Sequence, residues 1–334
     1  MKFVIAGGSG HLGTLLARAR SAAGDEVVVL SRTPQPAPWR VVAWDARTVG
    51  PWAAELEGAG AVINLAGRSV NCRYTAANRR AIMGSRVDST RAIGDAISRA
   101  AVPPAVWLQM STATIYAHRY DAPNDEQTGI IGGSEPGAPE AWRFSIDVAQ
   151  AWERAVDEAG VPGTRTVKLR TAVVMSPERG GPFDILLRLV RFGLGGRSGD
   201  GRQMISWIHD ADFVRAVDWI VRHDALRGPV NLAAPNPLPN GAFMRALRRA
   251  WGVPFGVPSP GWMLAVGAPL LGTETELVLK SRFVVPATLA AGGFVFDFPA
   301  WDVAARDLCT RWRRARGAPP AEEPTSSEPP AAAR

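Results

Sequence analysis

Short apolar runs, several of them rich in β-branched residues, alternate with longer segments in which apolar residues recur at helical spacing. The runs predict buried strands at residues 3–6, 26–30, 41–45, 61–67, 105–110, 166–174 and 229–232. The longer segments predict helices at residues 12–23, 75–100, 144–155 and 185–192. This alternation predicts an α/β fold with a Rossmann-type, doubly wound parallel sheet and right-handed crossovers.

The pattern changes near residue 240, where a small, mainly helical C-terminal domain is predicted to cover part of a cleft. Its expected elements are helices at 243–251, 262–271 and 275–283, an extended proline-rich stretch at 253–260, and a strand or turn at 292–296. The end of the chain is rich in Pro, Ala, Ser and Glu, a composition that predicts a disordered tail. The predicted division is therefore residues 1–238, 239–314 and 315–334.

A glycine-rich turn follows the first predicted strand and opens the first predicted helix. Gly7, Gly10 and Gly13 fit G-x-x-G-x-x-G, and the pattern G-x-G-x-x-G is met when Gly8 replaces Gly7. Such glycines permit a tight turn, a close backbone approach to a pyrophosphate, and close packing of helix on strand. The free N–H groups of the helix N-terminus then face the phosphates. The predicted dinucleotide contacts are Gly7, Gly8, Ser9, Gly10, His11, Leu12 and Gly13; a glycine turn without a ligand is the alternative.

The residues after the second predicted strand favour NADP(H) over NAD(H). NAD sites usually carry an acidic residue here for the ribose hydroxyls, but this chain has Ser31-Arg32-Thr33. Ser31 and Arg32 suit a 2′-phosphate, although Arg32 as an ordinary surface residue is the alternative. Asp45, at the end of the third strand, is predicted to face the adenine. The residues predicted to let a nucleotide lie over the end of the fourth strand are Leu65, Ala66 and Gly67.

Composition indicates an ordinary globular protein of 334 residues, 46% hydrophobic and 21% charged. Two cysteines exclude a disulfide framework or a cysteine metal cluster, so we expect a cytoplasmic protein without a metal. The longest apolar run, at 262–271, is too short to cross a bilayer, and the first strand begins without a charged leader. The net charge is +7, but the arginines are dispersed without a basic–aromatic stripe, so no nucleic-acid partner is expected.

Six stretches together resemble the extended short-chain dehydrogenase/reductases, the family of the nucleotide-sugar epimerases. Three are typical of the whole family: GGSGHLG at 7–13, VINLAG at 62–67 and STATIYA at 111–117. The other three are similar to an atypical epimerase-like subfamily: AWERA at 151–155, GLGGRSGDGRQMISWIHDAD at 193–212 and NLAAPNP at 231–237. Members of that subfamily carry a small C-terminal domain of unknown function, and some are labelled cell-division inhibitors. The resemblance implies NAD(P) binding by residues 1–238.

This resemblance also implies where the reaction would take place. A Ser or Thr after the fifth strand hydrogen-bonds the reacting oxygen in the broader family, and Thr112 stands there beside Ser111. A Tyr-x-x-x-Lys pair on the next long helix exchanges the proton, because the nearby positive charges lower the pKa of the phenol. Here the register puts Phe144 and Val148 at these two positions. No Tyr-x-x-x-Lys occurs anywhere in the chain.

Several other residues are candidates for the proton-transfer role or for cofactor contacts. Tyr116 is the first candidate for proton transfer, with a structural hydrogen bond as its alternative. Weaker candidates for proton transfer are Asp147, Glu153, Glu126 and His209. For His209, the alternative is a structural role as a helix cap. The resemblance further implies that cofactor or substrate contacts come from Arg86, Ser111, Thr171, Ala172 and Val173.

We therefore expect an NADP(H)-dependent oxidoreductase or epimerase-like enzyme that acts on a small polar substrate. The rival hypothesis is a non-catalytic NADP(H) sensor or regulatory protein, which the missing tyrosine and lysine motivate. The sequence leaves the oligomeric state open, and a homodimer is one of the alternatives.

Overall fold

The computed structural model describes residues 1–135, 139–261 and 274–317. Its centre is a seven-stranded sheet with the order β10-β6-β5-β4-β1-β2-β3, in which every neighbouring pair is parallel. This is the doubly wound sheet predicted from the sequence. The strands are β1 (Lys2–Ala6), β2 (Glu26–Ser31), β3 (Arg40–Ala43), β4 (Ala61–Asn64), β5 (Val106–Thr112), β6 (Arg165–Thr171) and β10 (Gly228–Leu232).

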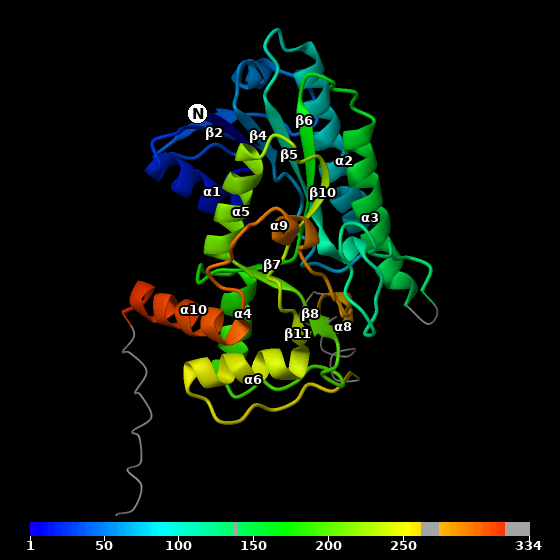
Figure 1. The fold of residues 1–334 in the computed structure, drawn as a ribbon, viewed down its shortest axis with the longest axis vertical. Helices are drawn as coiled ribbons and strands as arrows, with labels where there is room; N and C mark the ends of the chain where they lie inside the picture. Colours follow the sequence, from blue (N-terminus) through cyan, green and yellow to red (C-terminus); the bar gives the residue numbers. More distant parts are fainter. Residues whose placement is uncertain (136–138, 262–273, 318–334) are drawn as a thin grey trace, which may run out of the picture.

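Helices cover both faces of the sheet (Figure 1). One face carries α1 (His11–Ala22) and α5 (Asp210–Arg222), and the other carries α2 (Ala76–Arg99) and α3 (Glu140–Asp157). Successive side chains of a strand point to opposite faces. Phe3 and Ile5 accordingly join the apolar cluster under α1 and α5, whereas Val4 and Ala6 join the cluster under α2. Strands buried on both sides explain why the sequence shows continuous apolar runs.

Local signals set the ends of the helices on the α2–α3 face. Thr75 caps α2 by accepting a hydrogen bond from the Asn78 N–H at 3.2 Å, which satisfies one of the unpaired donors of a helix start. The chain turns after α3 at Gly160, whose φ of 56° lies in the left-handed region.

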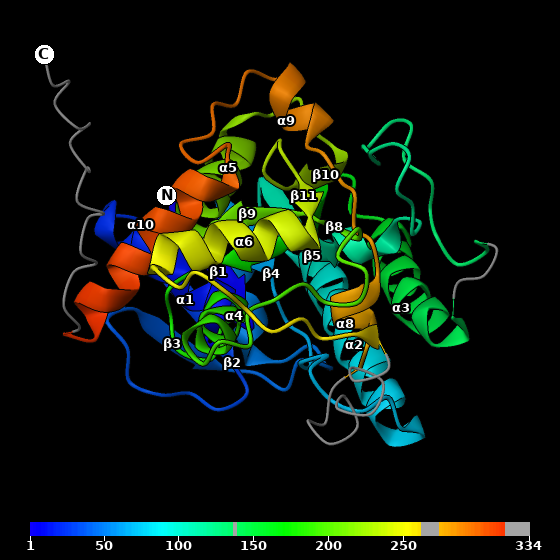
Figure 2. The same ribbon diagram turned by 90° about the horizontal axis from the view of Figure 1, so that it is seen from below.

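A smaller assembly lies beyond the carboxyl ends of the strands (Figure 1). It contains α4 (Pro182–Arg191), α6 (Asn240–Trp251) and α10 (Trp301–Ala315), and Figure 2 shows α6 and α10 side by side across this end. One apolar cluster joins Phe183 and Leu187 of α4 to Phe243 of α6 and Leu308 of α10. Residues on both sides of the predicted boundary at 238 therefore share a core, and the domain division stays a prediction.

Two predicted elements differ from the structure. The strand predicted at 166–174 is divided, because Val173–Met175 leaves the main sheet as β7 and pairs with β9 (Trp207–His209). The helix predicted at 275–283 is only α8 (Glu276–Leu279). The chain then runs extended, because the backbone N–H of Arg282 donates to the Met204 carbonyl and the Phe283 carbonyl accepts from the Asn124 N–H. These tertiary hydrogen bonds outweigh the local helical preference.

The remaining segments of the C-terminal part are short. Residues 292–296 form a turn and an irregular stretch after α9 (Ala287–Ala291), and β8 (Met204–Ile205) pairs with β11 (Leu238–Pro239). The helix predicted at 262–271 and most of the predicted tail lie outside the described residues. Among the described helices, none combines the length and the apolar character that crossing a membrane requires.

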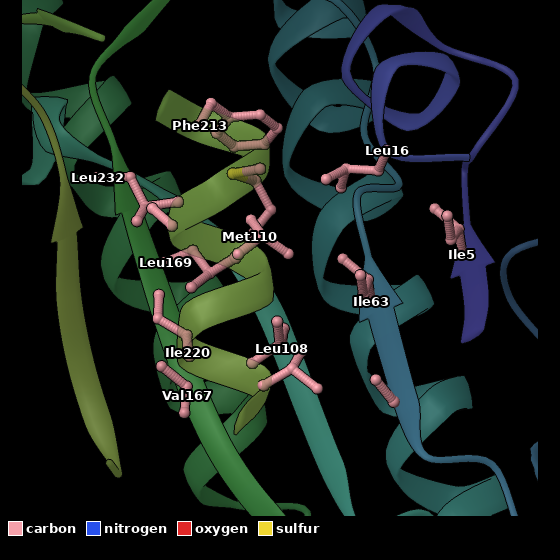
Figure 3. Close-up of a cluster of buried hydrophobic side chains, with 14 of the residues drawn as sticks. Ile5, Leu16, Ile63, Leu108, Met110, Val167, Leu169, Phe213, Ile220 and Leu232 are labelled. Atoms are coloured by element: carbon pink, nitrogen blue, oxygen red, sulfur yellow. The ribbon is translucent and has the colours of Figure 1, made fainter. Parts of the chain in front are cut away.

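Packing of α5 on the sheet gives a direct test of the core. Figure 3 shows Phe213 and Ile220 of α5 lying over side chains of β5 and β6, and Phe213 is 0% exposed. We expect Phe213→Ala to lower the free energy of unfolding by about 3–5 kcal/mol, because it removes buried apolar surface and leaves a cavity. Urea unfolding measures this change. Phe192→Ala is the matched control, since Phe192 is 77% exposed; equal losses in both variants would contradict the packing.

Candidate functional site

The glycine turn after β1 combines three crowded glycines, Gly7, Gly8 and Gly13, with one open glycine, Gly10. Gly7 has φ of 73°, and a Cβ there would lie 2.8 Å from the Cα of Ala66. A Cβ on Gly13 would lie 2.3 Å from the Cα of Gly8, so only glycine allows α1 to approach the turn this closely. A Cβ on Gly10 would meet only the carbonyl of Gly7, at 3.5 Å. The turn is therefore packed tightly against the protein at Gly7 and Gly13, and there is open space next to Gly10.

The N-terminus of α1 has the features of an anion site. Gly10 is its N-cap residue, no side chain caps the helix, and the first turn contains no acidic residue. Its unpaired N–H groups and the positive end of its dipole suit a phosphate group. Together with the open space above Gly10, this arrangement fits the pyrophosphate of a dinucleotide. His11 lies beside Gly181, and burial lowers the pKa of its imidazole.

The predicted ribose site lies at the end of β2. Ser31 is buried, and its hydroxyl lies 3.2 Å from Ser9 Oγ in the glycine turn. Arg32 is exposed, and within the described part of the chain it forms no hydrogen bond or ion pair. Asp45 closes its own loop instead, since its carboxylate accepts from the Thr48 hydroxyl and from the Thr48 and Arg47 N–H groups. These hydrogen bonds lower the pKa of Asp45 to about 2.

The loop after β4 is fixed from behind by buried amides. Asn64 Nδ2 donates to Gln109 Oε1 at 3.0 Å, and Asn64 Oδ1 accepts from the Ala66 N–H at 3.0 Å. These bonds hold the backbone of Leu65 and Ala66 at the strand end, where Gly7 approaches it. The loop from Leu65 to Gly67 is thus positioned next to the glycine turn. Two loops that contact the same nucleotide must be neighbours in this way.

Arg86 of α2 extends along this loop. A Cβ on Gly67 would lie 3.2 Å from Arg86 Cζ, and the guanidinium lies 5.0 Å from the centre of the Trp152 ring. Arg86 donates to the carbonyls of Arg68 and Ile82, and it forms no ion pair with a carboxylate of the described residues. Burial lowers the pKa of Arg86 to about 10, still far above neutrality. The site therefore contains a cation that no carboxylate neutralises.

The end of β5 presents Thr112. Its side chain is half-buried, and Oγ1 accepts from the Thr114 N–H at 3.1 Å. The hydroxyl hydrogen of Thr112 thus stays available for an acceptor. Ser111 points the other way, because its buried hydroxyl donates to Glu153 Oε1 at 2.7 Å. Thr171, at the end of the neighbouring β6, donates its hydroxyl to the Leu169 carbonyl, while Ala172 is buried and Val173 is half-buried in β7.

Tyr116 belongs to a buried polar network. Its hydroxyl accepts from Arg170 Nη1 and donates to Asn231 Oδ1, both at 3.0 Å. Arg170 in turn donates to both carboxylate oxygens of Glu153. Burial raises the pKa of the Tyr116 phenol, and its side chain is 2% exposed. This geometry favours the structural alternative for Tyr116.

The weaker proton-transfer candidates also have structural partners. His209 caps α5 by accepting from the Ala211 N–H, and its other ring nitrogen lies 3.0 Å from Asp307. Glu126 accepts from the Asn231 N–H at 2.8 Å, and burial raises its pKa. Asp147 is exposed on α3.

On α3 lie Phe144 and Val148, the residues that the resemblance predicts at the positions of the family's tyrosine and lysine. Val148 is buried, and Phe144 packs edge-to-face against Tyr74 with ring centroids 5.1 Å apart. The sequence pattern alone does not single out Tyr74, Ser145 or Glu276, which are linked by hydrogen bonds. The low number of tyrosines could have indicated Tyr74, because the chain contains only three that could replace the missing phenol.

Comparison with known proteins establishes the family. Residues 3–233 match the NAD dependent epimerase/dehydratase family. The chain belongs to this family. Residues 259–308 match a domain of unknown function, DUF1731. The resemblance to extended short-chain dehydrogenase/reductases with such a C-terminal domain is thereby confirmed.

The relatives include whole proteins of similar length. Epimerase family protein SDR39U1 of Bos taurus is 31% identical over 92% of this chain and 99% of that protein. The crystal structure of human SDR39U1 (isoform 2) with NADPH has a TM-score of 0.80 and 28% identity, covering 93% of this chain and 99% of that one. The UDP-N-acetylglucosamine 4-epimerase of Bacillus cereus has a TM-score of 0.68 at 16% identity over 94% of this chain and 99% of that one, a likeness of fold alone.

The crowded and open glycines should respond differently to an added methyl group. We expect Gly13→Ala to lower the free energy of unfolding by about 1–3 kcal/mol, because its Cβ would overlap the Gly8 backbone. Gly10→Ala, with open space around its Cβ, should leave stability within about 0.5 kcal/mol of wild type. Urea titration of both variants compares them. A Gly13→Ala protein as stable as Gly10→Ala would show that α1 does not pack on the turn in this way.

Proposed function

We propose that this chain is an NADP(H)-dependent oxidoreductase or epimerase-like enzyme that acts on a small polar substrate. The observation that carries the proposal is the open, uncapped glycine turn at α1, in a chain of the NAD dependent epimerase/dehydratase family. When bound, the nicotinamide would supply hydride-transfer chemistry. The backbone N–H groups of the turn would hold the pyrophosphate. Thr112 would donate a hydrogen bond to the reacting oxygen, since its hydroxyl hydrogen is not used elsewhere.

NADP(H) is preferred to NAD(H) in this proposal because of Ser31 and Arg32. Arg32 is exposed at the end of β2, and residues 31–33 contain no carboxylate for the ribose hydroxyls. The NADPH bound in the human SDR39U1 structure supports the same preference. We also propose a cytoplasmic location, because Cys72 and Cys309 are both free thiols.

The cofactor preference can be tested by charge reversal. We expect Arg32→Glu to weaken NADPH binding at least about tenfold, since it replaces a charge-assisted hydrogen bond with repulsion. NADH binding should weaken much less, because NADH lacks the 2′-phosphate. Isothermal titration calorimetry with both coenzymes measures the difference. Arg227→Glu is the control, as Arg227 is exposed at the amino end of β10. Equal losses for NADPH and NADH in Arg32→Glu would contradict a 2′-phosphate site at this residue.

Turnover is tested by the oxidation of NADPH in the presence of a panel of small carbonyl compounds. We expect Thr112→Val to lower the turnover rate about 100-fold, because it removes a donor to the reacting oxygen. Thr112→Ser should retain most of the rate, and NADPH affinity should be similar in all three proteins. A Thr112→Val enzyme with the wild-type rate would exclude the proposed role of this hydroxyl.

A non-catalytic NADP(H) sensor is the second candidate. It is favoured by Phe144 and Val148 at the positions of the family's proton-transfer pair. Tight NADPH binding without turnover of any carbonyl compound in the panel would support the sensor over the enzyme.

A further inference from the structure

Three polar side chains from separate elements meet beside Phe144. Tyr74 lies in the loop before α2, Ser145 lies in α3, and Glu276 opens α8. Ser145 Oγ donates to Glu276 Oε2 at 2.6 Å, and Tyr74 Oη lies 3.4 Å from Ser145 Oγ. The single hydroxyl proton of Ser145 is given to Glu276, so the Tyr74 phenol is the donor to Ser145. The result is a directed chain from phenol to hydroxyl to carboxylate.

This chain of hydrogen bonds occupies the place where the family's proton-transfer pair is missing. The Tyr74 ring packs edge-to-face on Phe144, the residue at the expected tyrosine position. Tyr74 is half-buried, so its ring is partly accessible from outside. The phenol of Tyr74, from the loop before α2, thus lies against Phe144, the position at which the family's tyrosine is expected.

We propose that Tyr74, Ser145 and Glu276 form a proton relay that takes the place of the tyrosine–lysine pair. Tyr74 exchanges the proton with the oxygen of the substrate, while Ser145 and Glu276 act through it as positioning residues. This inference rests on the proposed function, namely hydride transfer to or from a small polar substrate.

Each proton movement in the relay has a donor and an acceptor. In alcohol oxidation the substrate hydroxyl proton passes to Tyr74 Oη, the Tyr74 proton passes to Ser145 Oγ, and the Ser145 proton passes to Glu276 Oε2. The substrate's O–H bond breaks and an O–H bond forms on Glu276. The carbon-bound hydrogen leaves with its electron pair as a hydride to an oxidised nicotinamide nucleotide. Carbonyl reduction reverses every step.

The environment explains why a relay is needed. Burial raises the pKa of the Tyr74 phenol, so the phenol does not ionise by itself near neutral pH. Burial also raises the pKa of Glu276, whose side chain is 2% exposed, which makes its carboxylate a better proton acceptor. Glu276 Oε1 is buried and has no hydrogen-bond partner among the described residues. A buried carboxylate with one unsatisfied oxygen is costly in a purely structural role.

Charged groups around Glu276 connect the relay to the end of β5. Arg282 donates to the Glu276 carbonyl at 3.3 Å and to Thr114 Oγ1 at 3.0 Å, two residues beyond Thr112. Lys280 Nζ donates to the Thr114 carbonyl at 2.8 Å. Both cations oppose the rise in the pKa of Glu276, whereas the nearby Glu274 adds to it. Glu274 also accepts from the Tyr74 N–H at 2.7 Å, which fixes the loop that carries the phenol.

Kinetics of the full-length protein give the first test. The assay uses NADPH and the carbonyl compound of the panel that wild type reduces fastest. We expect Tyr74→Phe and Glu276→Gln each to lower kcat at least about 100-fold, with KM changed much less. NADPH affinity by calorimetry should stay within about twofold of wild type. Tyr120→Phe is the control, since Tyr120 is exposed and outside the relay. An active wild type with an equally active Tyr74→Phe variant would overturn the relay and leave the proposed function intact.

Tyrosine NMR tests the relay without requiring turnover. The chain has three tyrosines, so ¹³Cζ labelling gives three resonances, and Tyr74→Phe assigns one of them. We expect Glu276→Gln to lower the pKa of Tyr74, because it removes a neighbouring negative charge, while Tyr116 and Tyr120 are unaffected. If wild type turns over no compound, the catalytic part of the proposed function fails, and with it the relay as a catalytic device. A Tyr74 resonance and pKa unchanged in Glu276→Gln would overturn the coupling itself.

Discussion

The close contact between α1 and the turn after β1 is the constraint on which the candidate site depends. Gly13 lies so near Gly8 that no side chain fits between them. This contact points the uncapped N-terminus of α1 across the carboxyl ends of the central strands. Those strand ends carry Asn64 and Thr112, the residues that fix the loop after β4 and offer a hydroxyl after β5. The packing of α1 and the position of its uncapped N-terminus are therefore consequences of the same two glycines.

The region around Tyr74 and Glu276 is built differently, from segments that are far apart in the sequence. The stretch from Glu274 to Arg282 crosses the end of β5 and is held there by hydrogen bonds to Thr114 and to the Tyr74 backbone. It brings acidic and basic groups, among them Glu276 and Lys280, next to Ser145 of α3 and the end of β5. The C-terminal part thus contacts the loop before α2 and the end of β5.

Sequence patterns predicted the parallel sheet and the glycine turn, because each depends on local periodicity or on a short motif. They failed where long-range hydrogen bonds decide the backbone. The stretch after Leu279 looks helical, yet its N–H and C=O groups are bonded to Met204 and Asn124 in an extended form. The contact between Tyr74 and Phe144 could not be predicted either, since no periodicity links the loop before α2 to α3. Asp45 differs from these cases, because its carboxylate accepts from Thr48 of its own loop, which is a local contact.

We propose that the glycine turn at the start of the chain holds a phosphorylated nicotinamide nucleotide. Titration calorimetry of the full chain with NADPH tests this most directly, alongside Gly10→Glu, which places a negative side chain in the open space of the turn. We expect saturable binding of NADPH to wild type and no binding to a Gly10→Glu protein that remains folded. Absence of binding to wild type, or equal binding by the two proteins, would contradict it.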